Sequence, residues 1–220
     1  VTYRRHTNFA MESIEQTFNG QADFGRRVTC TISRNGDLAY RTYLQITLPE
    51  IGQSLSSGNV YARWLDFPGE QLISQVEVEI GGQRIDKHYQ RWWRLYSELS
   101  LTEDKKNQWA KMTTSATGKI GGTVYLPLIF FFNRNPGLFL PLIALQYHEV
   151  RLDFDLAGDY NEYLDPTGFK VWGNYVYLDV EERNRFAQKG HEYLIEQVQH
   201  TGTDTIDSAG TAKSIRLSFN

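Results

Sequence analysis

Two histidine–glutamate pairs are the side chains of this sequence with the clearest potential for metal chemistry. His148-Glu149 and His191-Glu192 each match the beginning of the His-Glu-x-x-His motif, in which two histidines one helical turn apart bind zinc. The second histidine would stand at position 152 or 195, where the sequence has Leu152 and Ile195. The motif is therefore absent, and we predict no zinc centre.

Motifs for phosphate binding and for nucleophilic catalysis are also incomplete. Gly118-Lys119 could end a phosphate-binding loop, but Thr113 stands where the first glycine is needed. The segment Gly52–Ser56 lacks the second glycine of a nucleophile elbow. Cys30 lies on the apolar face of a predicted strand, so we expect a small buried hydrophobic residue and not a nucleophile. We predict no catalytic residues, no cofactor and no enzymatic activity.

Acidic residues gather on one predicted strand and in one loop. Asp153 and Asp155 share a strand face with Glu149 and Arg151, and paired carboxylates can bind Ca²⁺ or transfer protons. A solvated strand face that keeps a sheet soluble has the same pattern, and we favour that interpretation. The loop Asp159–Asp165 lacks the spacing of a calcium loop. We therefore predict no metal site.

Basic and aromatic residues alternate over Lys87–Arg94, a mixture that can stack on bases and hold phosphates. Neighbouring helical side chains point about 100° apart, so only one of Trp92 and Trp93 needs to face the core. The other could lie at an interface, where Trp and Arg are enriched. We favour a core contact combined with a subunit or domain interface over nucleic-acid binding. The candidate interface residues of this helix are Arg91, Trp92, Trp93 and Tyr96.

Composition restricts the class of protein that must position these residues. The 220 residues are 40% hydrophobic and 22% charged, which is typical of a folded domain. Twenty-three basic and 26 acidic residues leave a net charge of −3, which argues against a generally basic nucleic-acid binder. The longest apolar run, Val124–Phe132, is shorter than the roughly 20 residues of a membrane helix. We predict no transmembrane segment, and with one cysteine there is no internal disulfide.

Alternation of apolar and polar residues is the dominant pattern and predicts β-strands. Asn35-Gly36 and Gly81-Gly82 are strong turn signals between such segments. The predicted strands cover residues 28–33, 43–48, 76–80, 83–87, 123–132, 149–155, 172–180 and 192–199.

Three helices are predicted between and after these strands. Trp92, Leu95, Tyr96 and Leu99 have the spacing of an apolar helical face. A capping box at Asp179 and a C-terminal Gly190 enclose a helix over 181–188, and another covers 104–112. The elements together predict an all-β protein, an eight-stranded antiparallel jelly-roll sandwich with short helical insertions. Because successive jelly-roll strands usually lie in opposite sheets, we place the Asn35-Gly36 turn at a corner of the sandwich.

The end of the chain predicts a domain boundary. Residues 1–200 form the jelly roll in this interpretation, and 201–213, rich in Thr, Ser, Asp and Gly, form a linker. In 214–220, Ile215, Leu217 and Phe219 alternate with polar residues. We interpret this as the first strand of a further domain whose remainder is absent, with these three residues at a domain interface. Both ends suggest a segment of a longer protein.

Several blocks of the sequence closely resemble the major capsid proteins of nucleocytoplasmic large DNA viruses, with those of the algal chloroviruses as the nearest type. The blocks extend over most of residues 3–198. They are Tyr3–Ile14, Ile32–Leu38, Glu79–His88, Leu126–Asn133, Pro136–Leu138, Leu140–Val150, Glu182-Arg183, Arg185–Gln188 and His191–Gln197.

The resemblance implies a double jelly-roll capsid protein, of which this chain is the first jelly roll and the linker. It implies homotrimers that form pseudo-hexagonal capsomers of an icosahedral shell. The expected partners are neighbouring capsomers and minor capsid proteins beneath the shell, without direct nucleic-acid contact. The expected location is the virion, with assembly in the cytoplasm of the host cell. The residues alone leave one alternative open, a jelly-roll carbohydrate-binding module whose exposed Trp and Tyr stack on sugars.

Overall fold

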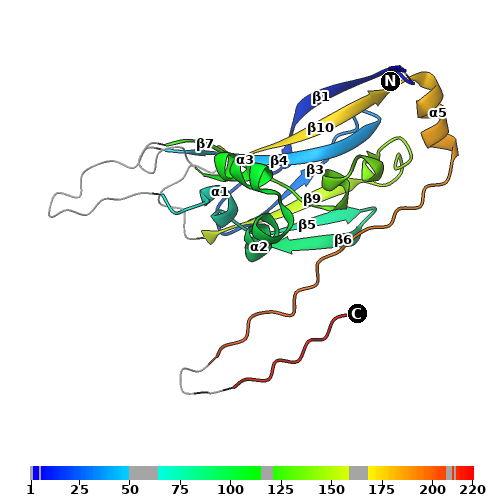
Figure 1. The fold of residues 1–220 in the computed structure, drawn as a ribbon. Helices are drawn as coiled ribbons and strands as arrows, with labels where there is room; N and C mark the ends of the chain where they lie inside the picture. Colours follow the sequence, from blue (N-terminus) through cyan, green and yellow to red (C-terminus); the bar gives the residue numbers. More distant parts are fainter. Residues whose placement is uncertain are drawn as a thin grey trace.

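A computed structural model describes residues 2–4, 6–49, 64–114, 121–158, 168–206, 210 and 212–220 as a sandwich of two antiparallel sheets (Figure 1). The strands are β1 (Phe9–Gln16), β2 (Phe18–Asn19), β3 (Arg27–Thr31), β4 (Leu38–Leu48), β5 (Ile73–Ile80), β6 (Gln83–Tyr89), β7 (Gly122–Pro127), β8 (Leu140–Pro141), β9 (Val150–Leu156) and β10 (Lys170–Leu178). The helices are α1 (Pro68–Gln71), α2 (Gln90–Ser100), α3 (Glu103–Thr113), α4 (Phe131–Arg134), the 3₁₀ turn η1 (Pro136–Leu138) and α5 (Val180–Gln188).

Strand order identifies how the sandwich is wound. The first sheet has the order β1-β10-β4-β7, with β8 paired to β4, and the second has the order β2-β3-β9-β5-β6. The chain passes from one sheet to the other between β1 and β2, β3 and β4, β4 and β5, β6 and β7, β8 and β9, and β9 and β10. The structure therefore has ten strands among its described residues and not the eight predicted. The two shortest, β2 and β8, have two residues each and carry no periodic pattern that a sequence could reveal.

Both predicted turns lie between strands as expected. Gly81 and Gly82 join β5 to β6 with φ values of 60° and 80°, the left-handed conformation of a tight hairpin that glycine adopts without steric cost. Asn35-Gly36 joins β3 of one sheet to β4 of the other, which confirms its place at a corner. A Cβ atom at Gly36 would lie 2.7 Å from the Cβ of Tyr175, so the corner has room only for glycine.

The core lies between the sheets and is built from the inward residues of each strand. Leu44 and Ile46 of β4 face Val76 and Leu152 of the second sheet, as members of one buried cluster. Cys30 belongs to this cluster, and burial raises the pKa of its thiol to about 12. The thiol is therefore protonated at neutral pH, which confirms a small buried hydrophobic residue.

Apart from shifts at other strand ends, one predicted strand is absent, one is too long and one long observed strand was not predicted. The segment 192–199 is not a strand. The Gln197 side-chain amide donates a hydrogen bond to the Ile85 carbonyl of β6, and the Val198 N–H donates to the Asp86 carboxylate at 3.0 Å. These side-chain bonds occupy the groups that a backbone ladder would need. The strand predicted over 123–132 ends at Pro127, and its continuation turns into α4. The edge strand β1 was not predicted, because nearly all of its side chains are exposed on both faces.

Helices α1, α2 and α3 gather on one side of the sandwich, and α5 extends from the end of β10 (Figure 1). Both α3 and α5 begin one residue before the predicted start, and the Asp179 carboxylate accepts a bond from the Val180 N–H at 2.7 Å. The predicted glycine cap at Gly190 is wrong, because the chain leaves α5 in extended conformation at Lys189.

Candidate assembly interface

The helix α2 presents an exposed face that differs from the predicted one. The predicted apolar face contained Leu95 and Leu99, but these side chains are 52% and 81% exposed. The side chains that α2 buries are Trp93, which is 0% exposed, and Ser97. The helix follows β6 directly, so the strand fixes which residues turn inward. We call the line formed by Arg91, Leu95 and Leu99, at successive i, i+4 positions, the α2 outer face.

The two tryptophans of α2 divide as predicted, because Trp93 is in the core and Trp92 is half-buried beside it. The Trp92 ring lies 6.1 Å from the His88 ring and 6.1 Å from the Tyr96 ring. Tyr96 in turn lies beneath the Arg134 guanidinium, 5.7 Å from it. Neither indole N–H finds a hydrogen-bond partner among the described residues. Of the predicted helix residues, only Arg91 is fully exposed, while Trp92 and Tyr96 form the border between core and surface.

A buried carboxylate fixes α1, α2 and α3 to one another. The Glu70 carboxylate accepts a hydrogen bond from the Trp109 indole N–H at 2.5 Å and lies 3.7 Å from the Arg94 guanidinium. The Arg94 guanidinium also lies over the Phe67 ring, 3.6 Å from its centroid. Burial raises the pKa of Glu70, and the bond from Trp109 partly offsets that effect. The three helices therefore form one rigid unit on the side of the sandwich.

The segment between α5 and the predicted linker crosses the molecule without joining a sheet. Its Tyr193 hydroxyl donates to the Phe139 carbonyl at 2.7 Å, and its Glu196 carboxylate lies 3.0 Å from the Arg134 guanidinium. Asp86, which accepts from this segment, also lies 2.9 Å from the buried His88 ring. Residues 193–198 are thus fixed to β6 and to the turn after α4.

The second group of predicted interface residues is exposed and forms no strand. Ile215, Leu217 and Phe219 are 46%, 65% and 52% exposed. The Asn220 N–H donates to the Gln199 side chain at 2.9 Å, so the end of the chain lies beside the segment that leaves the jelly roll. The structure does not bring these three residues together with the α2 outer face. In the sequence, the predicted linker 201–213 separates these three residues from the jelly roll. Its residues 207–209 and 211 are outside the described part of the chain.

The acidic strand face is solvated only in part, because Glu149 is exposed and Arg151 and Asp155 are half-buried, so the prediction is wrong only for Asp153. Asp153 is 3% exposed, and Arg27 joins the carboxylates of Asp155 and Glu77 at 2.8 Å and 3.0 Å. Across β9, the Arg151 guanidinium binds Glu79 of β5 at 2.5 Å. The outer face of the second sheet is thus a lattice of ion pairs that connects its strands. No group of three side chains suited to a metal occurs among the residues that the structure describes, and the loop 159–165 lies outside them.

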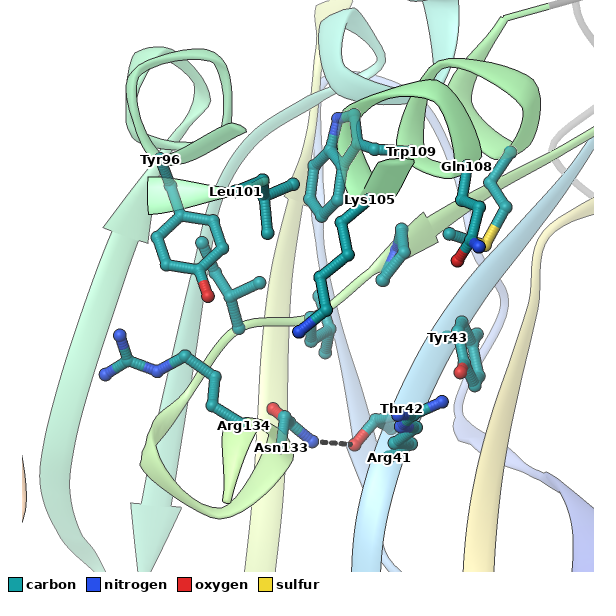
Figure 2. Close-up of a pocket in the computed structure, with 14 residues that line it drawn as sticks. Arg41, Thr42, Tyr43, Tyr96, Leu101, Lys105, Gln108, Trp109, Asn133 and Arg134 are labelled. Carbon is teal, nitrogen blue, oxygen red and sulfur yellow. Dashed lines mark hydrogen bonds between the residues drawn. The ribbon is translucent and has the colours of Figure 1, made fainter. Parts of the chain in front are cut away.

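The sequence interpretation missed a cavity between α3, α4 and the outer face of β4 (Figure 2). Its volume is about 200 Å³. Lys105 of α3 extends toward Asn133, whose side-chain amide donates to the Thr42 hydroxyl at 3.0 Å (Figure 2). Arg41 lies on β4 at the other side. The residues of this cavity come from five separate elements, α2, α3, α4, β4 and β7, and have no common spacing, so only the fold assembles them.

No tryptophan of the chain is fully exposed on the surface. The five tryptophans of the chain are all buried or half-buried: Trp64, Trp92, Trp93, Trp109 and Trp172. The carbohydrate-binding alternative also named tyrosines, and Tyr3, Tyr125 and Tyr147 are exposed, so aromatic exposure alone does not decide between the two functions. No helix in the described ranges has the length and apolar character needed to cross a membrane.

These features define a jelly-roll domain with a helical unit on one side, a network of ion pairs on the outer face of the second sheet, and exposed apolar residues on α2 and at the C-terminal end of the chain. The chain belongs to the family described as major capsid protein N-terminus, whose model matches residues 1–179.

Relatives and solved structures agree with this assignment. The chain is 53% identical to the major capsid protein of Phaeocystis pouchetii virus, with 100% of this chain and 51% of that protein covered. It is 47% identical to the major capsid protein of Paramecium bursaria Chlorella virus 1, with 100% and 52% covered. The quasi-atomic model of the PBCV-1 virus capsid matches with a TM-score of 0.84 at 45% identity, over 100% of this chain and 55% of that chain. The chain spans about half the length of the curated relatives it matches.

A more distant structure supports the fold alone. The Faustovirus major capsid protein matches with a TM-score of 0.63 at 10% identity, over 84% of this chain and 57% of that chain. The sandwich architecture therefore persists where the sequence has almost entirely changed.

Proposed function

We propose that this chain is the first jelly roll of a major capsid protein, a structural protein of the shell of a large icosahedral DNA virus. The observation that carries the proposal is the 53% identity over the whole chain to a protein named major capsid protein. Three copies of the full-length protein would associate into a pseudo-hexagonal capsomer. Residues 201–213 would lead into a second jelly roll, and 214–220 would be its first strand.

The proposed role is structural and requires no catalysis or cofactor. The partners would be the other two copies of the trimer, neighbouring capsomers, and minor capsid proteins beneath the shell. The protein would be located in the virion and assembled in the host cytoplasm, without direct contact to nucleic acid. Two titratable groups with extensive partners, Glu77 and Asp155, support this because their ion pairs with Arg27 hold neighbouring strands together.

The α2 outer face is our proposed contact with a neighbouring subunit or with the second jelly roll. Leu95 and Leu99 expose apolar surface beside Arg91, and Trp92 and Tyr96 border it. The helical unit beneath is rigid, since Glu70 links α1, α2 and α3. Trp, Tyr and Arg, the residue types that border this face, are enriched at the positions that contribute most to the energy of an interface.

Ile215, Leu217 and Phe219 are proposed to pack into the second jelly roll. Their alternation predicts a strand, and no strand of the described residues pairs with it. Hydrogen exchange on the full-length protein, beside the fragment 1–220, tests this. The amides of 215–219 should be protected only in the full-length protein. Equal protection in both would place the strand in the first jelly roll and move the domain boundary.

Self-association distinguishes the capsid role from a sugar-binding role. Sedimentation velocity of the full-length protein should show a trimer, and a glycan array should show no specific ligand. A monomer that binds glycans would contradict the proposal.

A further inference from the structure

The cavity of Figure 2 continues into an aromatic surface on the outer face of the first sheet, and the two share Tyr43. The first part lies between α3 and β4 and has a volume of about 200 Å³. The second is an open hollow over β4, β7 and β10. We call the two together the α3 groove. Its lining includes Arg41, Tyr43, Lys105, Met112, Tyr125 and Trp172.

The cavity end of the α3 groove carries positive charge that the protein does not neutralise. Arg41 and Lys105 are exposed, and neither forms an ion pair with any described residue. Arg134 lies at the same end, but Glu196 pairs with it. The lining residues of the cavity include no carboxylate. Two unpaired cations over one cavity stand out in a chain whose net charge is −3.

The floor of this cavity is held in place by buried hydrogen bonds. The Asn133 side chain donates to the Thr42 hydroxyl at 3.0 Å and to the Tyr40 carbonyl, and it accepts from the Phe130 N–H at 3.1 Å. The wall is fixed by Trp109, whose indole binds the buried Glu70. The site is therefore preorganised, which lowers the entropic cost of binding a partner.

The other end of the α3 groove is an apolar platform. Trp172 of β10 lies opposite Tyr43 of β4 in the sheet, and its indole N–H donates to Gln45 at 2.7 Å. Tyr125 of β7 is 36% exposed beside them, and Met112 of α3 borders the platform. Lys170, which lies opposite Gln45, forms an ion pair with Glu15 at 3.7 Å, so its charge is already paired. Aromatic rings with Met are typical of surfaces that receive apolar side chains.

We propose that the α3 groove binds an extended acidic segment of a partner protein, with a carboxylate between Lys105 and Arg41 and an adjacent apolar side chain on the Tyr43–Trp172 platform. The charge of the cavity selects an anion, and the platform selects an apolar neighbour, which together describe a peptide with alternating acidic and apolar residues. A nucleic acid fits less well, because it would need a longer run of cations along its phosphates. The proposal rests on the proposed function, in which a capsid subunit must bind other proteins.

Fluorescence anisotropy with a labelled hexapeptide of alternating Glu and Leu tests the proposal on the full-length protein. The peptide should bind, and rising salt should weaken it because the contact is partly ionic. Lys105→Glu and Arg41→Glu should each weaken binding by about tenfold, the effect of losing a charged hydrogen bond. Lys111→Glu is the matched control, because it reverses a charge on the same helix outside the groove. It should change affinity by less than about twofold.

Several results would overturn the proposal. A hexapeptide of alternating Lys and Leu that binds equally well would show that the charge is irrelevant. Competition by hexathymidylate or by inorganic phosphate at the same concentration as the peptide would assign the groove to phosphate groups. Unchanged affinity in Lys105→Glu and Arg41→Glu would place the peptide elsewhere. Sedimentation of the same variants separates the two proposals, because loss of peptide binding with trimers intact leaves the capsid role standing.

Discussion

Removing the Trp93 side chain should strongly destabilise the jelly roll, although the residue lies on a helix outside the two sheets. The side chain is 0% exposed and belongs to the core cluster. Truncating a buried tryptophan to alanine costs about 3–5 kcal/mol of unfolding free energy. That is a large part of the roughly 5–15 kcal/mol of a typical domain. We therefore expect Trp93→Ala to unfold at a much lower urea concentration.

Replacing Trp93 by phenylalanine should have a much smaller effect. The Trp93 indole N–H is buried and has no hydrogen-bond partner among the described residues, and such a group costs about 1–3 kcal/mol. Phenylalanine removes that group and leaves a cavity of roughly 40 Å³, which costs about 1 kcal/mol. The two effects oppose each other, so we expect Trp93→Phe to change the free energy of unfolding far less than Trp93→Ala does.

Urea denaturation followed by circular dichroism measures both variants, with Leu99→Ala as the exposed control on the same helix. A constant m-value would show that only stability has changed. Our reasoning is refuted if Trp93→Ala costs less than about 1 kcal/mol, or if Trp93→Phe costs as much as Trp93→Ala.

Three further predictions concern charge, assembly and solubility. Burial alone would raise the pKa of Asp155, but hydrogen bonds from Arg27 and Gln75 outweigh burial and lower the pKa. The ionised carboxylate therefore stabilises the fold at pH values above 3.8, its ordinary pKa. This stabilisation is lost as the pH falls through the lower pKa of the folded state. Arg27→Gln should therefore flatten the loss of stability in urea titrations below about pH 4, and an unchanged slope would contradict the ion-pair account. The double substitution Leu95→Ser and Leu99→Ser should weaken trimer association, measured by sedimentation, by roughly 2–4 kcal/mol and leave the melting temperature unchanged. A lower melting temperature with intact trimers would show that α2 serves only the core of its own domain. The fragment 1–220 should be less soluble than one that ends at residue 202, because it exposes an unpaired apolar strand; equal solubility in a centrifugation assay would argue against this.

Much of the fold could be predicted because the strands between the sheets alternate regularly. Val76 and Val78 of β5 point inward between Glu77 and Glu79, and this pattern survives in the structure. The strand β1 lacks the pattern. It is an edge strand that is exposed on both faces, so neither face requires apolar residues at alternate positions. The segment 192–199 has the pattern of a strand, but its Val198 N–H donates to the Asp86 side chain and not to a neighbouring strand.

The candidate interface was harder to predict, because helix faces depend on where the preceding strand ends. The spacing of Leu95 and Leu99 indicated a buried face, yet β6 delivers α2 with Trp93 inward. Asp153 was expected on a solvated face, but it is almost fully buried and accepts a hydrogen bond from its cross-strand partner Thr29 at 2.7 Å. Arg41 and Lys105 lie 64 positions apart in the sequence, so only the fold could show that they share a cavity.

Electron cryomicroscopy of capsomers assembled from the full-length protein tests the central proposal most directly. We predict a pseudo-hexagonal particle with six jelly rolls, in which residues 1–200 fit three alternate positions and the strand 214–220 belongs to the other three. The α2 outer face should then be covered by a neighbouring jelly roll. Particles with a single jelly roll, or six positions that residues 1–200 fit equally well, would contradict the assignment of this chain as the first half of a trimeric double jelly-roll capsid protein.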